Sequence, residues 1–264
     1  MNRAILSGLI LLLITPLLIA SENLKEEEVL RKVAEKAEKN DKAAMNFGFK
    51  LQTIIKKMDT DGKLEEEIQR DSHIIWLEGK PYNELLNING KPLDPNNKAE
   101  EAKRKSEFMK TVRDKKKTLR EMLTWNDLFQ KYDFTFLPPD GSAHYLISFK
   151  PKPKKLVERN VYEKVFNHAA GKAWIDDQFN LLRAEAWLTE SIRFGFGIFG
   201  KIDGIYFTYS QKEFDQVWLP LAFFLKYKAR RFLFNDNQEI TTRFYDFYPR
   251  PDENQPKTAG TNQH

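Results

Sequence analysis

The chain has 264 residues, with 43 lysines and arginines against 38 aspartates and glutamates, and it contains no cysteine. The lack of cysteine excludes disulfides, a thiol nucleophile and a lipid-modified cysteine behind an N-terminal signal. The net charge of +5 is interspersed along the chain, which argues against nucleic-acid binding because that function needs concentrated positive charge.

Residues 1–21 have the order of a secretory signal peptide. A basic start is followed by an apolar run at residues 4–20, and Ala20 and Ser21 are small residues of the kind found at cleavage sites. An uncleaved anchor is the alternative, but the run is close to the lower limit for crossing a bilayer. We expect cleavage after Ala20 or Ser21, a periplasmic protein, and a single domain at residues 22–248.

The mature chain is expected to begin with a helix and then a strand. Residues 24–39 place apolar side chains near helical spacing between charged ones, which is typical of an amphipathic helix. From Met45 the period changes to two, with Phe47, Phe49 and Leu51 alternating with smaller or polar residues. This alternation predicts a strand with one buried face.

Three Gly-Lys turns follow, at residues 61–63, 78–81 and 89–92. Glycine supplies the positive φ that tight hairpin turns require, and residues 63–77 and 82–88 between the turns have strand length and composition. The pattern predicts a long antiparallel meander.

Asp94-Pro95 predicts the start of a helix, because aspartate caps helix N-termini and proline fits the first turn. The segment behind it is densely charged and has only a narrow apolar stripe. We expect a helical insertion at about residues 95–120 that lies across the sheet or projects from it. A basic binding arm is the alternative, although charge runs are usually solvated faces.

Strand patterns dominate the C-terminal half. Residues 132–137 and 143–149 predict two strands, and residues 157–170 predict a short helix that ends at Gly171. The polar, proline-rich tail at residues 249–264 is expected to be disordered. Six further strands are predicted at residues 172–176, 181–189, 192–202, 205–214, 216–229 and 239–248.

The stretch RFGFGIFG contains Gly195-x-Gly197-x-x-Gly200, the spacing of a dinucleotide-binding loop. Such a loop needs a helix directly behind it, because the pyrophosphate lies at the helix N-terminus. The residues that follow predict instead a turn at Gly204 and a second aromatic strand. We therefore expect no cofactor.

We interpret the same stretch as part of a continuous strand at residues 192–202. Alternation then places large apolar side chains on one face, while Gly195 and Gly197 leave the other face bare, which suits strong curvature. The large side chains on that face are Phe194, Phe196 and Ile198.

No other motif predicts catalysis or a metal site. Residues 59–62 resemble a calcium loop but lack ligands at both ends, so they are expected to form a turn. The four histidines have no ligand-like spacing. Asp176, Asp177 and His144 are the faint candidates for a hydrolase, but two aspartates behind a strand favour a turn. We expect a protein that is not an enzyme and holds no metal.

Apolar residues are concentrated on one side of the last strands. Phenylalanine occurs 20 times in the chain. In LAFFLKYKARRFLF, alternation separates a basic face from an apolar face that includes Leu221. That apolar face either packs on the helices or leaves room for an apolar ligand under a curved sheet with few helices. The basic residues are Lys226, Lys228 and Arg230, and the other apolar residues are Phe223, Leu225 and Tyr227.

The order of these elements resembles the outer-membrane lipoprotein-sorting family, the LolA/LolB-like proteins, and its distant bacterial members most of all. The likeness covers most of residues 24–248. It implies an α+β, mainly β fold: a strongly curved antiparallel sheet, or incomplete β-barrel, with helices covering the concave face. It also implies a non-catalytic periplasmic carrier that receives acyl chains. The residues that carry the resemblance are Trp174, Ile175, Asp176, Leu182, Arg183, Glu185 and Ala186 in one hairpin, and Trp218, Leu219 and Pro220 at a later strand.

The leading hypothesis is therefore a carrier for acyl chains of lipoproteins or lipids, monomeric, with transient contact to a membrane allowed. An envelope sensor or scaffold that binds a protein partner is the second hypothesis, and a hydrolase is the third. The residues predicted to line the ligand site are Phe194, Phe196, Ile198, Phe207, Phe223, Leu225 and Tyr227.

Overall fold

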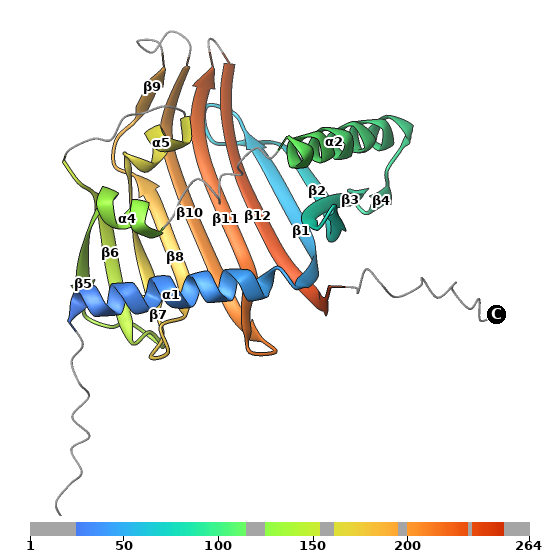
Figure 1. Ribbon diagram of the computed structural model, residues 1–264. Helices are drawn as coiled ribbons and strands as arrows, with labels where there is room; N and C mark the ends of the chain where they lie inside the picture. The colour runs from blue at the N-terminus through green and yellow to red at the C-terminus, as the bar shows by residue number, and fades with distance from the viewer. Residues whose placement is uncertain (1–24, 115–124, 154–160, 195–199, 232–233, 251–264) are drawn as a thin grey trace, which may run out of the picture.

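The computed structural model describes residues 25–114, 125–153, 161–194, 200–231 and 234–250, and these form an open antiparallel sheet with four helices (Figure 1). The sheet has 12 strands and does not close, so the fold is mainly β and is consistent with an incomplete barrel. The predicted signal peptide and most of the predicted disordered tail lie outside the described residues. The strands are β1 (Phe47–Met58), β2 (Leu64–Leu77), β3 (Lys80–Ile88), β4 (Lys91–Pro92), β5 (Tyr132–Leu137), β6 (Tyr145–Pro151), β7 (Ala169–Ile175), β8 (Leu181–Leu188), β9 (Ile192–Phe194), β10 (Gly200–Phe214), β11 (Val217–Arg231) and β12 (Phe234–Pro249).

In the strand order, the first strand β1 and the last strand β12 are neighbours in the middle of the sheet. The order runs β4-β3-β2-β1-β12-β11-β10-β8-β7-β6-β5, with β9 paired to β10 off this path. The predicted meander forms one side, and its turns have the expected positive φ at Gly62, Gly79 and Gly90. The chain then crosses to the far edge at β5 and returns strand by strand until β12 pairs with β1.

Helix α1 (Glu26–Ala44) covers one face of the sheet, which we call the inner face. Its buried residues Val29 and Val33 pack against Ile147 of β6 and Ile175 of β7, and these four form the hydrophobic core. Near the other end of the helix, the Asn40 side chain bonds to the backbone N–H and C=O of Trp218 at the start of β11, at 2.7 Å each. Helix α1 therefore spans from the β6–β7 side to β11 (Figure 1).

Helix α2 (Pro95–Arg113) begins as Asp94-Pro95 predicts: the Asp94 carboxylate accepts a hydrogen bond from the Asn97 N–H at 2.8 Å. It contacts β3 through Tyr82, whose ring centroid lies 5.0 Å from that of Phe108. The described residues of α2 include none that are buried. The helical insertion is therefore a solvated helix along the edge of the sheet, and residues 115–120 of the predicted segment lie outside the described residues.

Strand register places α2 on the face opposite α1. Lys50, His73 and Glu84 are successive cross-strand partners on β1, β2 and β3, so they share a face. Leu51, next to Lys50, points to the inner face. Glu84 bonds to Lys105 of α2. The helices thus cover both faces, α1 the inner and α2 the outer.

Two short helices complete the described part of the chain. Helix α4 (Trp125–Lys131) precedes β5, and no sequence pattern predicted it. Helix α5 (Val161–Phe166) lies within the predicted helix at 157–170 but ends well before Gly171. None of the helices in the described ranges is long and apolar enough to cross a membrane.

The prediction that Gly171 ends a helix is wrong. Gly171 lies inside β7, where a Cβ atom would come within 2.3 Å of the Phe149 ring and within 2.1 Å of the Glu185 carbonyl oxygen. The glycine allows neighbouring strands to approach closely rather than ending a helix.

The prediction of one strand at residues 192–202 is also wrong. β9 and the start of β10 pair antiparallel, with Phe194 opposite Gly200, so the chain reverses direction between them. The expected turn at Gly204 is instead a register shift between Ile202 and Gly204 inside the long strand β10. Glycine spacing was ambiguous here because hairpins and bulges both use glycine.

Candidate ligand-binding face

Strands β10 and β11 carry six large side chains that face the same side of the sheet. On β11, Phe223, Leu225 and Tyr227 alternate with outward-facing residues such as Lys226, as the sequence predicts. The rings of Phe207 and Phe223 are in contact, with centroids 5.3 Å apart. We call this group the apolar patch. Its members are Ile205, Phe207, Tyr209, Phe223, Leu225 and Tyr227.

The apolar patch lies on the inner face, the same face as α1. Tyr209, Ala184, Ala173 and Ile147 are successive cross-strand partners across β10, β8, β7 and β6. Directly opposed residues point to the same side of a sheet. Because Ile147 belongs to the core under α1, the patch continues that core toward β11.

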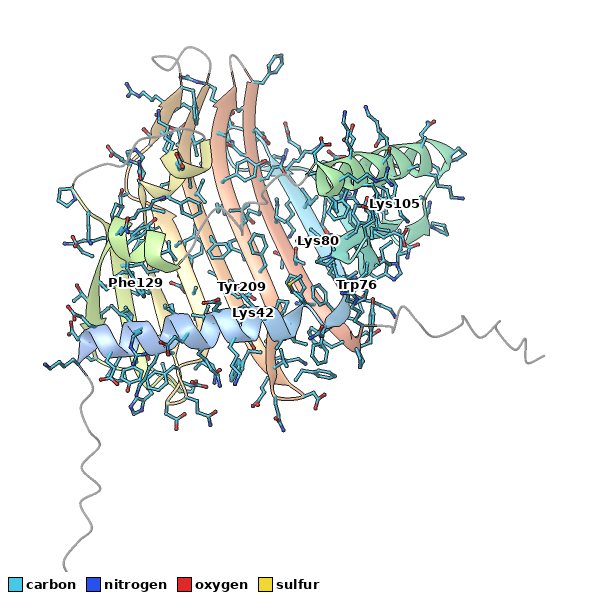
Figure 2. All side chains as sticks on the ribbon, in the orientation of Figure 1. Lys42, Trp76, Lys80, Lys105, Phe129 and Tyr209 are labelled. Atoms are coloured by element: carbon cyan, nitrogen blue, oxygen red, sulfur yellow. The ribbon has the colours of Figure 1, made fainter. Side chains whose placement is uncertain are left out.

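The cover over the inner face changes along the sheet. Where α1 packs on the sheet, Val29 of the helix and Ile175 of β7 are each 1% exposed, and Ile147 of β6 is 3% exposed. All six residues of the apolar patch are only half-buried. In Figure 2, Tyr209 lies over the middle of the sheet, between the level of α1 and the helices above it. The described helices therefore leave part of the apolar face uncovered.

The hydroxyl groups of the two tyrosines in the apolar patch both form side-chain hydrogen bonds. Tyr227 donates to Asp236 Oδ2 at 3.1 Å, and burial, helped by this carboxylate, raises the pKa of Tyr227 to about 12. The Tyr209 hydroxyl accepts a bond from Gln211 Nε2 at 2.9 Å. Both phenols turn an aromatic body to the patch and a bonded hydroxyl to its border, which suits an amphiphilic ligand.

A cluster of phenylalanines borders the inner face at the end where β1 begins. The ring centroids of Phe49 and Phe244 lie 5.3 Å apart, and those of Phe214 and Phe247 lie 5.5 Å apart. Phe47 contacts Phe214 at 5.9 Å. These residues come from β1, β10 and β12, so only tertiary pairing brings them together, and sequence alternation alone did not reveal the cluster.

The structure brings together four of the seven predicted site residues. Phe207, Phe223, Leu225 and Tyr227 share the patch, while Phe194 lies on β9 with Lys164 Nζ of α5 at 5.2 Å from its ring centroid. Phe196 and Ile198 lie outside the described residues. Ile205 and Tyr209 were missed, although the two-residue period through Phe207 would have identified both.

Two open hollows border β11 and β12, and neither lies over the middle of the patch. One of about 820 Å³ is lined by residues that include Gln52, Leu221 and Arg243. Another of about 390 Å³ lies at the β1–β2 turn and borders Tyr227. Neither is lined by Phe207, Phe223 or Leu225, so these three residues form an open surface, and Tyr227 alone of the patch lines a hollow.

Of the three candidate catalytic residues, Asp176 has a structural role. The Asp176 carboxylate accepts hydrogen bonds from the N–H groups of Gln178 and Asn180 and from Asn180 Nδ2, at 2.7 to 2.9 Å. The His144 ring contacts the ring of Tyr145 at 4.5 Å. Asp177 is exposed. These three hydrogen bonds stabilise the turn that the sequence predicted, and they occupy the Asp176 carboxylate.

Other acidic and histidine side chains form pairs rather than clusters. His73 contacts Glu84 at 2.8 Å, and His168 contacts Glu190 at 2.7 Å. Asp59 accepts from the N–H groups of Asp61 and Lys63, which makes the predicted turn. Within the described ranges, no group of three or more histidine, aspartate or glutamate side chains could hold a metal ion.

Two solved structures show distant likenesses to this chain. No family model and no curated protein matches it. Among solved structures, the chain is similar to a DUF1329 family protein from Desulfovibrio piger ATCC 29098, with 10% identity over 86% of this chain and 95% of that chain and a TM-score of 0.29. It is also similar to MucB in complex with MucA(peri), with 9% identity over 86% of this chain and all of that chain and a TM-score of 0.23. These TM-scores are too low to carry a conclusion about fold or function.

Proposed function

We propose that the protein is an exported, non-catalytic carrier that binds acyl chains of lipids or lipoproteins on the inner face of its sheet. The observation that supports this is the apolar patch on β10 and β11. The patch continues the hydrophobic core, but its residues are half-buried, whereas the core residues are buried under α1. The sequence resemblance to lipoprotein-sorting proteins points to the same class of ligand and to the periplasm.

Burial of hydrocarbon would supply the affinity. Each methylene group removed from water contributes about 0.8 kcal/mol. The patch residues are held in register by two long paired strands, so little ordering is required when a ligand binds. The absence of charged side chains among the six residues favours an acyl chain over a polar ligand.

Ligand binding is tested with residues 22–264 by displacement of a fluorescent fatty acid and by native mass spectrometry. Phe223→Gln places a polar group on the patch and is expected to weaken fatty-acid binding at least tenfold, since about 1.5–3 kcal/mol of apolar burial is removed. Phe224→Gln is the matched control, because Phe224 is the adjacent residue and faces the other side, against Tyr206.

Two outcomes would count against the carrier. One is that protein purified from its own source repeatedly contains no lipid and takes up none in vitro. The other is that Phe223→Gln and Phe224→Gln weaken binding equally, which would place the ligand elsewhere or reflect general loss of structure.

A scaffold for an envelope protein is the second candidate, and the geometry of α2 favours it. This helix is held by specific contacts, with Arg104 bonding to the Tyr82 hydroxyl and the Asn83 carbonyl and Arg113 bonding to Glu78, yet it buries none of its residues. A fixed helix with an exposed face is suited to recognition. If substitutions on its exposed face abolish capture of an envelope protein while fatty-acid binding is unchanged, the scaffold function is supported.

A further inference from the structure

One end of the sheet carries a row of basic residues on its outer face. Arg193 of β9, Lys201 of β10 and Arg230 of β11 are successive cross-strand partners, so their side chains lie side by side. Lys228 is two residues from Arg230 on the same face and is exposed. Like charges opposite one another destabilise a sheet, so we expect this row to lower the free energy of unfolding. A role outside folding would account for its presence.

Nearby carboxylates neutralise only part of this row. Asp203 forms an ion pair with Lys201. Asp236 accepts hydrogen bonds from Tyr227 and Gln238. No ion pair joins Arg193, Lys228 or Arg230 to another described residue, so these three present positive charge to the solvent.

The same end carries the most exposed large apolar side chain of the described residues. Phe234 is 78% exposed, against 47% for the next, Leu64. Phe234 begins β12 opposite Arg231, one position from the pair that Arg230 makes with Asn235. Figure 1 shows the ends of β9, β10, β11 and β12 together at the top of the sheet. By strand register Phe234 lies on the inner face and Arg230 on the outer face, so the exposed ring and the basic row border the same end of the sheet from its two faces.

We propose that this end of the sheet docks on the surface of an anionic lipid bilayer. Phe234 enters the interfacial region, and Arg193, Lys228 and Arg230 contact lipid phosphates. Basic residues together with an inserted apolar side chain are the two contributions that hold peripheral proteins on anionic membranes. Arg193 and Arg230 flank Lys201 at one level of the sheet and Lys228 lies two residues farther along β11, so the cations lie near one end of the sheet, where they can meet the plane of a membrane. The docking is independent of whether the apolar patch binds a ligand.

The test is vesicle flotation with residues 22–264, which omit the apolar N-terminal run that would itself bind membranes. Vesicles contain either phosphatidylcholine alone or phosphatidylcholine with phosphatidylglycerol. The protein is expected to float with the anionic vesicles and to be released by salt. Each neutralised basic residue, as in Arg230→Gln or Arg193→Gln, should weaken partitioning about fivefold, and Phe234→Ser should weaken it about tenfold or more.

Matched controls lie at the opposite end of the molecule. Met45→Ser removes another exposed apolar side chain, 39% exposed, between α1 and β1. Lys39→Gln removes one exposed charge from α1. Both are expected to leave flotation unchanged. Phe223→Gln is expected to float normally even where it loses fatty-acid binding, so failure of docking and failure of the carrier are told apart.

The proposal is overturned if the protein floats with neither kind of vesicle, or if Arg230→Gln and Phe234→Ser float as well as the unaltered chain. It is also overturned if Phe234→Ser has no effect while polyglutamate competes as well as anionic vesicles do, because the surface would then bind acidic polypeptide by charge alone. Circular dichroism confirms that each variant is folded, and the high exposure of Phe234 and Arg230 makes folding defects unexpected.

Discussion

Gly171 occupies a position in β7 where a side chain does not fit. The space that a Cβ atom needs is filled by the Phe149 ring and the Glu185 carbonyl oxygen. Gly204, in contrast, lies beside a register shift in β10, has no positive φ, and has no atom within 4 Å of the place that a Cβ atom would take. The two strand glycines thus have opposite tolerance to substitution.

Gly171→Ala is expected to lower the free energy of unfolding by about 2–4 kcal/mol, because overlap with a backbone carbonyl is not relieved by rotating a side chain. Gly204→Ala is the control and is expected to change it by no more than about 0.5 kcal/mol. Urea unfolding followed by circular dichroism measures both. Equal stability of the two variants would contradict the packing described around β7.

Two tyrosines, Tyr132 buried and Tyr227 half-buried, are expected to make the protein sensitive to alkali. Burial raises the pKa of Tyr227 to about 12 and raises that of Tyr132 above its ordinary value. In the unfolded chain a tyrosine titrates near pH 10. Because the folded pKa is higher, the stabilising contribution is fully present below about pH 10 and is lost as the pH rises through about 12.

We therefore expect the melting temperature to fall as the pH rises above about 10, together with the appearance of phenolate absorbance. Tyr227→Phe should show a smaller fall between about pH 10 and 12 than the unaltered chain. If the variant follows the same pH profile, ionisation of Tyr227 does not contribute to alkaline unfolding.

At the level of elements, α1 is attached to the sheet in two different ways. Its first half packs Val29 and Val33 into the core, whereas its second half is joined to β11 by the paired hydrogen bonds of Asn40 with Trp218. The apolar pattern of residues 24–39 predicted the first attachment. The second depends on one polar residue and a distant backbone, and no local pattern indicates it.

Asn40→Ala is expected to destabilise the protein by about 1–3 kcal/mol, because it leaves the Trp218 N–H and C=O without these partners. Hydrogen exchange should rise most in the second half of α1 and at the start of β11. Lys39→Ala, an exposed neighbour, serves as the control. Uniform exchange across α1 in the variant would show that the Asn40 contacts do not hold this half of the helix.

Strand periodicity predicted most elements, and the errors occurred where glycine has several uses. The meander of β1, β2 and β3 and the alternating faces of β11 follow directly from turn residues and two-residue spacing. The paired strands β9 and β10 were mistaken for one strand because apolar residues continue in the sequence between them. Four of the six residues of the apolar patch were predicted, since alternation gives the face of each strand but not which strands become neighbours.

At the level of the whole molecule, the sheet depends on pairing between its first and last long strands. β12 joins β1 along most of its length, and Thr53 and Thr242 bond at 3.0 Å across this pair. Nothing in the sequence of either strand predicts that they meet. The sequence resemblance implied a curved sheet, and the pairing order shows how it is built.

A chain that ends at residue 233 lacks β12 and is expected to be insoluble, because the long edges of β1 and β11 would be left without partners. A chain that ends at residue 250 keeps every described strand and should have the same melting temperature as the chain that ends at residue 264. Expression of both, with solubility and thermal unfolding as measurements, checks this. A soluble, cooperatively folded product without β12 would mean that the two halves fold independently.

The pairing of β1 with β12 also governs when the molecule can fold. The Thr53–Thr242 bond joins residues 189 positions apart, so the strand that provides Thr242 is synthesised long after the strand that provides Thr53. Native contacts of such high contact order form slowly, since a long loop must close before they contribute. The edge of β1 therefore stays unpaired until β12 has been synthesised, and a holding chaperone during that interval would raise the yield of native protein.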